Sequence, residues 1–129
     1  MSTSGSKNGT DSSTALAYIE CLEKCKSRSD ALQLLVRISD AITYIAPEDV
    51  PTAVKKLAER FAVENEVAVR AKIFWVFAEL GEVTPDTLEK AKIVTEIAEL
   101  LRNEESHRVK SRGLATLLKL GDYQRCIYL

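Results

Sequence analysis

An internal repeat with an offset of forty residues constrains the fold of this chain more than any other feature. The segment 65–81 aligns without a gap on 105–121, and the segment before it, 53–61, aligns on 93–101. The matched pairs are Val69 with Val109, Arg70 with Lys110, Lys72 with Arg112, Leu80 with Leu120 and Gly81 with Gly121. A unit of this length holds two helices, which can bury their apolar faces only by stacking on neighbouring units.

A period near forty residues is typical of HEAT and armadillo repeats, and it predicts an all-α fold, an α-solenoid of antiparallel helix pairs. We expect six helices in three pairs, at about 13–24, 30–45, 50–63, 66–80, 85–102 and 107–120. The first pair fits the offset poorly, as expected of a terminal repeat with one face in water. No segment alternates apolar and polar residues with the period of two that a strand requires.

Capping signals set the expected ends of these helices. Ser27 or Ser29 can cap the second helix, and Pro47 should end it. Gly81 should end the fourth helix in the left-handed conformation, with Thr84 capping the fifth. Gly121 should close the sixth.

The bulk composition predicts one folded domain. We expect a disordered tail at 1–13, the solenoid at 14–121 and a C-terminal tail, produced by truncation, at 122–129. Eighteen basic and 19 acidic residues give a net charge of -1, which argues against an electrostatic attraction to nucleic acid, and no sequence-specific binding motif is present. The longest apolar run, 73–78, is far shorter than a membrane span.

No residue pattern predicts a catalytic site, a cofactor site or a metal site. His107 is the sole histidine, in a polar turn with no acid to orient it, and we expect it at a helix start. Cys21 and Cys25 are four residues apart, but zinc requires four ligands, so we interpret them as buried structural thiols. Cys126 begins a sequence that formally matches a prenylation motif, without a second membrane signal.

The helix at 66–80 has two apolar stripes on nearly opposite sides, which predicts a central helix packed on both. A narrow strip remains for solvent and includes Lys72 and Trp75. The offset places Arg108, Arg112 and Lys119 on the matching strip of the sixth helix. We predict that these two strips lie side by side and bind a protein partner through Lys72, Trp75, Arg108, Arg112 and Lys119, since tryptophan and arginine dominate interface hot spots. Arg70 and Lys110, just after each turn, should instead pair with an acidic or amide residue of the turns, namely Glu64, Asn65, Glu104 or Glu105.

Four segments resemble, in order and spacing, the N-terminal HEAT-repeat region of the Integrator complex subunit 4 family. They are 29–35 (SDALQLL), 64–73 (ENEVAVRAKI), 101–109 (LRNEESHRV) and 116–121 (TLLKLG). The resemblance implies a nuclear, non-catalytic scaffold that holds Integrator subunits 9 and 11 in the machine that cleaves nascent RNA polymerase II transcripts, including small nuclear RNA 3' ends. It carries over no inositol phosphate site, because the tail before the first helix holds only Lys7.

Two other functions remain open. A generic cytosolic HEAT-repeat adaptor would have the same periodicity. A prenylated, membrane-associated regulator would require modification of Cys126.

Overall fold

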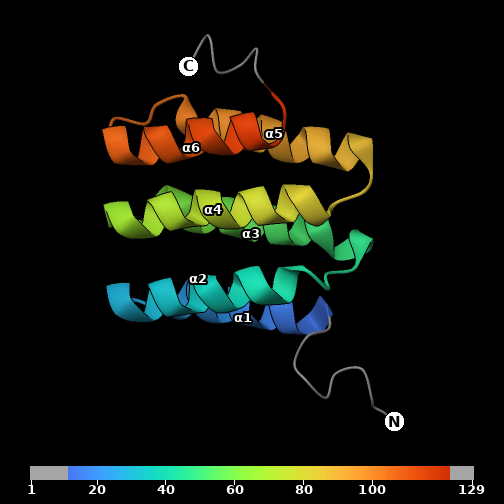
Figure 1. The fold of residues 1–129 in the computed structure, drawn as a ribbon. Helices are drawn as coiled ribbons and strands as arrows, with labels where there is room; N and C mark the ends of the chain where they lie inside the picture. The colour runs from blue at the N-terminus through green and yellow to red at the C-terminus, as the bar shows by residue number, and fades with distance from the viewer. Residues whose placement is uncertain (1–11, 123–129) are drawn as a thin grey trace.

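A computed structural model describes residues 12–122, and all regular structure in that range is helical (Figure 1). The α-helices are α1 (Ser12–Lys24), α2 (Arg28–Ile42), α3 (Val50–Val63), α4 (Val67–Val83), α5 (Thr87–Leu101) and α6 (His107–Lys119). A short 3₁₀ helix, η2 (Pro47–Asp49), precedes α3. The predicted all-α class with six helices is confirmed. Apart from Ser12, Ser13 and Asp122, both predicted tails lie outside the described residues.

The helices form two layers, with the even-numbered helices in one and the odd-numbered helices in the other (Figure 1). In the even layer α4 lies between α2 and α6, and in the odd layer α3 contacts both α1 and α5. Each odd helix packs against the even helix that follows it. The turns within the three pairs lie along one edge of the stack (Figure 1). Side chains from successive pairs meet at this edge, as Arg70 and Glu104 do.

The two apolar stripes predicted on α4 are buried. Ile73, Phe77 and Leu80 are fully buried, as is Phe74 on the opposite stripe, whereas Val67 at the helix start remains 37% exposed. The Phe74 ring packs edge-on against Phe61 of α3, with ring centroids 5.0 Å apart. A helix with apolar faces on both sides is stable only between neighbours, and the stack supplies them.

Serine hydroxyl groups cap the starts of α2 and α6. Ser27 caps α2 by accepting from the Asp30 N–H at 3.3 Å, as predicted. The hydroxyl of Ser106 accepts from the Val109 N–H at 3.3 Å and caps α6, which places His107 at the first position of that helix.

The predicted end of α4 was wrong. Gly81 lies inside α4, which continues to Val83, and the Thr84 hydroxyl donates to the Leu80 carbonyl at 2.7 Å and does not cap α5. The cap of α5 is Asp86, whose Oδ1 accepts from the N–H groups of Leu88 and Glu89 at 2.8 and 3.0 Å. An aspartate two residues after the threonine supplied a better-placed acceptor.

The C-terminal ends of α2 and α6 were also predicted from the sequence. The second helix was expected to reach residue 45, but α2 ends at Ile42, and Pro47 begins η2. Gly121 has a φ of 88° and closes α6, as predicted. The Asp122 N–H then donates to the Leu117 carbonyl at 2.9 Å, the backbone pattern of a left-handed helix end.

Candidate partner-binding site

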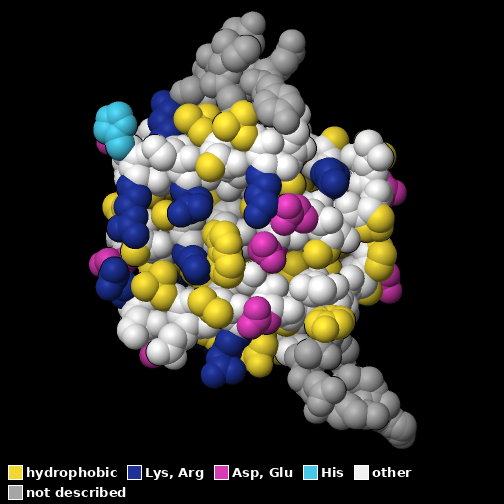
Figure 2. Space-filling model, in the orientation of Figure 1, with side chains coloured by type: hydrophobic (Ala, Val, Ile, Leu, Met, Phe, Trp, Pro, Cys, Tyr) yellow, Lys and Arg dark blue, Asp and Glu magenta, His cyan; other side chains and the backbone are white. Residues whose placement is uncertain are grey.

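An open hollow of about 560 Å³ lies between α4 and α6 on the surface of the even layer. Most of its lining residues come from the two strips that the forty-residue offset predicts to be neighbours; Ala71 and Ser111 are the additions. The lining residues are Ala68, Ala71, Lys72 and Trp75 of α4 and Arg108, Ser111, Arg112 and Ala115 of α6. Figure 2 shows basic side chains gathered over these two helices around apolar atoms. We call this feature the α4/α6 hollow.

Trp75 lies in the α4/α6 hollow and is half-buried, with part of its side chain packed against the core. The Lys72 Nζ atom lies 3.7 Å from the centroid of the Trp75 ring, a cation–π contact. Sequence reasoning placed both residues on one strip but did not predict that the ammonium would cover the ring. A partner's apolar group that contacts the ring must therefore displace or flank Lys72.

Arg108 and Arg112 are exposed and stand one helical turn apart on α6, so both guanidinium groups project on the same side of that helix. The position of α6 relative to α4 is fixed by Thr116, which is buried. Its hydroxyl lies 3.2 Å from the Phe74 carbonyl of α4 and 2.9 Å from the Arg112 carbonyl. The two strips are thus held together by a buried polar contact as well as by apolar packing.

Lys119 lies outside the α4/α6 hollow. Its Nζ atom pairs with Glu82 at 3.6 Å, and both side chains are more than 40% exposed, at 49% and 44%. The structure therefore brings together Lys72, Trp75, Arg108 and Arg112, four of the five residues predicted as partner-binding, and leaves Lys119 near the opposite end of α6. Sequence reasoning did not single out Ser111, which adds a hydroxyl to the lining.

The predicted pairing of Arg70 with a turn acid is confirmed. Arg70 lies over the Phe61 ring, 4.5 Å from its centroid, and reaches Glu104 in the turn between α5 and α6, with Nη2 and Oε1 2.5 Å apart. Glu104 also accepts from the Ser106 N–H at 3.0 Å. Lys110, at the matching position on α6, makes no ion pair with any described residue, so the same prediction was wrong for Lys110.

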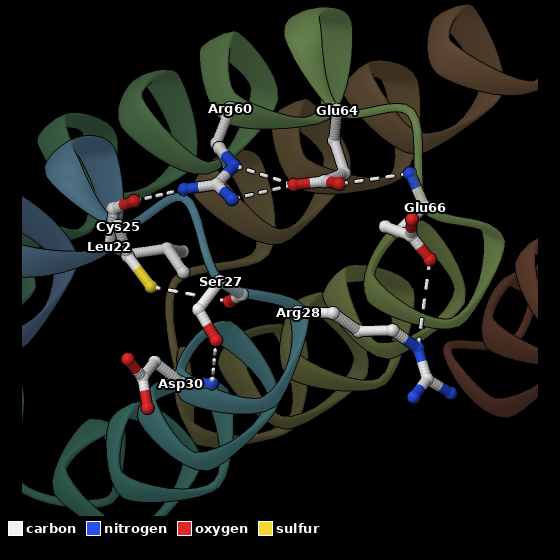
Figure 3. Close-up of polar contacts among 8 residues, drawn as sticks. All are labelled: Leu22, Cys25, Ser27, Arg28, Asp30, Arg60, Glu64 and Glu66. Carbon is white, nitrogen blue, oxygen red and sulfur yellow. Dashed lines mark hydrogen bonds and ion pairs between the residues drawn. The ribbon is translucent and has the colours of Figure 1, made fainter.

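Glu64, which the offset places on Glu104, is a second turn acid that was expected to pair with Arg70 or Lys110, but its basic partner is Arg60. Glu64 accepts from the Glu66 N–H at 2.9 Å and from Arg60 Nη2 at 2.6 Å (Figure 3). The same guanidinium donates to the Leu22 carbonyl, and therefore joins the end of α1 to the turn between α3 and α4. The arginine that pairs with Glu64 is on α3, whereas the arginine that pairs with Glu104 is on α4. The forty-residue offset therefore repeats the acidic residue of the turn but not its arginine partner.

The residues that sequence reasoning considered for metal binding or catalysis are scattered. Cys21 is exposed and Cys25 half-buried, so the interpretation of both as buried thiols was wrong; Cys25 lies beyond the last residue of α1. Within residues 12–122 no group of three potential ligands could hold a metal ion. His107 is exposed. In the same range no helix is both long and apolar enough to cross a membrane, and Cys126 lies outside the described residues.

Comparison with known proteins gives one consistent match. Over 113 residues, 85% of this chain, the sequence is 34% identical to Integrator complex subunit 4 of Xenopus laevis, and it has the same identity and coverage with the human and mouse proteins. The chain is similar to Integrator complex subunit 4. The resemblance that the sequence segments indicate is thereby confirmed. The chain spans only 11% of the length of these relatives. No protein-family model matches it. No solved structure matches it either.

Proposed function

We propose that this chain is a non-catalytic scaffold that binds a protein partner in the α4/α6 hollow and acts within the Integrator complex. The observation that carries the proposal is the α4/α6 hollow itself, where three basic side chains surround a half-buried tryptophan. The similarity of the chain to Integrator complex subunit 4 supports the Integrator complex as the assembly in which the chain would act. The resemblance further suggests a nuclear location and Integrator subunits 9 and 11 as partners, in support of the module that cleaves RNA 3' ends, including those of small nuclear RNAs.

The chemistry of the α4/α6 hollow selects the kind of partner surface. Lys72, Arg108 and Arg112 favour carboxylates, and the exposed part of Trp75 favours an apolar or aromatic side chain between them. A partner carboxylate would pair with Lys72 and draw its ammonium away from the ring, which would free the ring for contact. The partner therefore needs acidic residues around an apolar residue.

Quantitative affinity purification tests this function and this site together. The tagged chain, carrying Arg108→Glu and Arg112→Glu, is compared with the wild type in nuclear extract, and captured proteins are measured by mass spectrometry. Lys119→Glu is the matched control, since it reverses a basic residue of the same helix outside the α4/α6 hollow. We expect the double variant to lose roughly tenfold or more of the captured Integrator subunits, which corresponds to about 1.4 kcal/mol, and the control to retain them.

The two parts of the proposal fail in different ways. If the wild type captures no Integrator subunit, the assembly is wrong. If the wild type and the double variant capture equal amounts, or if Lys119→Glu loses as much capture as the double variant, the α4/α6 hollow is not the binding surface.

A further inference from the structure

A second hollow lies in the odd layer, between α3 and α5, and has a different character from the α4/α6 hollow. It is open, with a volume of about 560 Å³. Its apolar lining consists mainly of Val54, Ala58 and Ala62 of α3 with Ile93 and Leu100 of α5. We call it the α3/α5 groove. Val54, Ala58 and Leu100 are only partly buried and pack against the core with their inner sides, so their outer sides form an apolar floor.

The dimensions of the α3/α5 groove suit a helix. Its lining on α3 extends from Pro51 to Ala62, which at 1.5 Å per residue is about 16 Å, or three helical turns. Along α3 the short side chains of Ala58 and Ala62 leave the space above the floor open. No strand exists within residues 12–122 to accept an extended peptide by backbone pairing. A helix, which satisfies its own backbone hydrogen bonds, needs only side-chain contacts from the groove.

The charges on the rim of the α3/α5 groove decide which helix fits. Glu89 pairs with Lys92 at 3.1 Å, and this pair neutralises one end of the groove. Glu59 on the α3 wall and Glu96 on the α5 wall make no ion pair within the described residues, and Lys55 is the remaining basic residue on the rim. Two unpaired carboxylates on opposite walls against one ammonium favour a ligand with basic residues on both sides of its apolar face.

We propose that the α3/α5 groove binds an amphipathic helix of a partner protein. Its apolar residues, spaced i, i+3 or i+4, and i+7, contact Val54, Ala58 and Leu100, and lysine or arginine residues flanking that stripe pair with Glu59 and Glu96. The α4/α6 hollow lies in the other layer and is basic, so the two surfaces recognise partners of opposite charge. A short stack of three helix pairs can then bridge two proteins. The proposal does not depend on which complex the chain joins.

The test uses a defined probe. A fluorescein-labelled helical peptide of about 14 residues, roughly four turns, carries a leucine stripe with lysines on both sides, and a matched peptide has glutamates in place of the lysines. Fluorescence anisotropy measures binding to the wild-type chain, and methyl NMR of Val54 and Ile93 locates the bound peptide. We expect saturable binding of the basic peptide, with chemical-shift changes at the methyl groups of these two residues. The acidic peptide should bind at least tenfold more weakly, a difference in binding free energy of about 1.4 kcal/mol.

Two variants and one control separate the groove from other surfaces. Ala58→Arg places a long side chain in the groove, and Glu59→Lys with Glu96→Lys reverses its rim; circular dichroism checks that both remain folded. We expect either change to weaken the basic peptide about tenfold or more. Lys119→Glu, on α6 in the other layer and outside both hollows, should leave its affinity unchanged.

Several outcomes would overturn the proposal. These are an absence of saturable binding, equal binding of both peptides, or shifts confined to α4 and α6. Undiminished binding of the basic peptide to the variant with Glu59→Lys and Glu96→Lys would also overturn it. A dimer in sedimentation that Ala58→Arg dissociates would show that a second copy of this chain occupies the groove instead.

Discussion

Two glycines inside helices, Gly81 and Gly113, differ in what an added methyl group would meet. A Cβ atom at Gly113 would lie 2.4 Å from Leu101 Cδ2 and 2.9 Å from its Cγ, and Leu101 is only 1% exposed. A Cβ atom at Gly81 would lie 2.7 Å from a terminal carbon of Leu120, which is half-buried just after α6. Leu101 has no space into which to move, whereas Leu120 can rotate toward solvent.

This difference predicts opposite results for the same substitution. Gly113→Ala should destabilise the chain by about 1 to 2 kcal/mol, because the overpacking of Leu101 outweighs a gain in helix propensity of roughly 0.5 to 1 kcal/mol. Gly81→Ala should be neutral or slightly stabilising. Urea unfolding of both variants measures the two free energies. Equal destabilisation would mean that Leu120 is as constrained as Leu101.

The truncation of Trp75 should separate binding from folding. Because Trp75 is half-buried, Trp75→Ala should destabilise the chain by roughly 1 to 2 kcal/mol, less than the 2 to 5 kcal/mol typical of a fully buried leucine such as Leu80. It should also weaken partner capture by roughly 1 to 3 kcal/mol if the ring is a hot spot. Thermal unfolding of Trp75→Ala and Leu80→Ala gives the comparison. If both variants lose equal stability, Trp75 is a core residue and the binding surface lies elsewhere.

At the scale of helices and turns, acidic side chains join successive pairs along one edge of the stack. The side chain of Glu104 is 2% exposed and holds both Arg70 of the preceding pair and the backbone N–H of Ser106. Glu64 holds Arg60 of its own pair and the Glu66 N–H, and Arg60 reaches the preceding pair through the Leu22 carbonyl (Figure 3). Arg28 of α2, in the preceding pair, contacts Glu66 at 3.6 Å. These contacts fix the position of each turn relative to its neighbour.

Removal of one acid should therefore loosen two helix pairs. Glu104→Ala should destabilise the chain by about 2 to 3 kcal/mol, because Arg70 loses its charge partner and Ser106 N–H its acceptor. Glu99→Ala is the control, since its ion pair with Arg102 is exposed and contributes little. Replacement of both Arg70 and Glu104 by methionine should recover part of the loss. Urea unfolding measures all three, and a Glu104→Ala effect no larger than the Glu99→Ala effect would contradict the proposed link.

The same elements explain what the sequence could and could not predict. Apolar spacing is a property of one helix, so the two buried stripes of α4 and the neighbouring strips of α4 and α6 followed from the sequence and its offset. Helix ends depend on competition between nearby caps, and Asp86 displaced Thr84 in that role. Contacts between pairs, such as Arg60 with Leu22, join residues far apart in the chain, and no periodicity specifies them. The α3/α5 groove depends in the same way on which side chains remain short where two helices meet.

At the scale of the whole molecule, the stack presents two surfaces of unlike charge. The even layer carries the basic α4/α6 hollow, and the odd layer carries the α3/α5 groove with its unpaired carboxylates. The formal net charge of -1 does not reveal this separation of basic and acidic residues between the two layers. Association at the α4/α6 hollow should therefore depend on salt, even though the chain as a whole is nearly neutral.

The last helix of the even layer, α6, should govern self-association of the isolated chain. Leu118 on α6 is 46% exposed, and an uncovered apolar stripe on a solenoid helix tends to pack against another copy. We expect concentration-dependent dimers or larger species in sedimentation velocity, reduced by Leu118→Lys. Val63→Lys is the control, because Val63 is 74% exposed but lies at the end of α3, away from α6. A chain that stays monomeric at high concentration, or one that Val63→Lys disperses equally well, would show that α6 is not the self-associating surface.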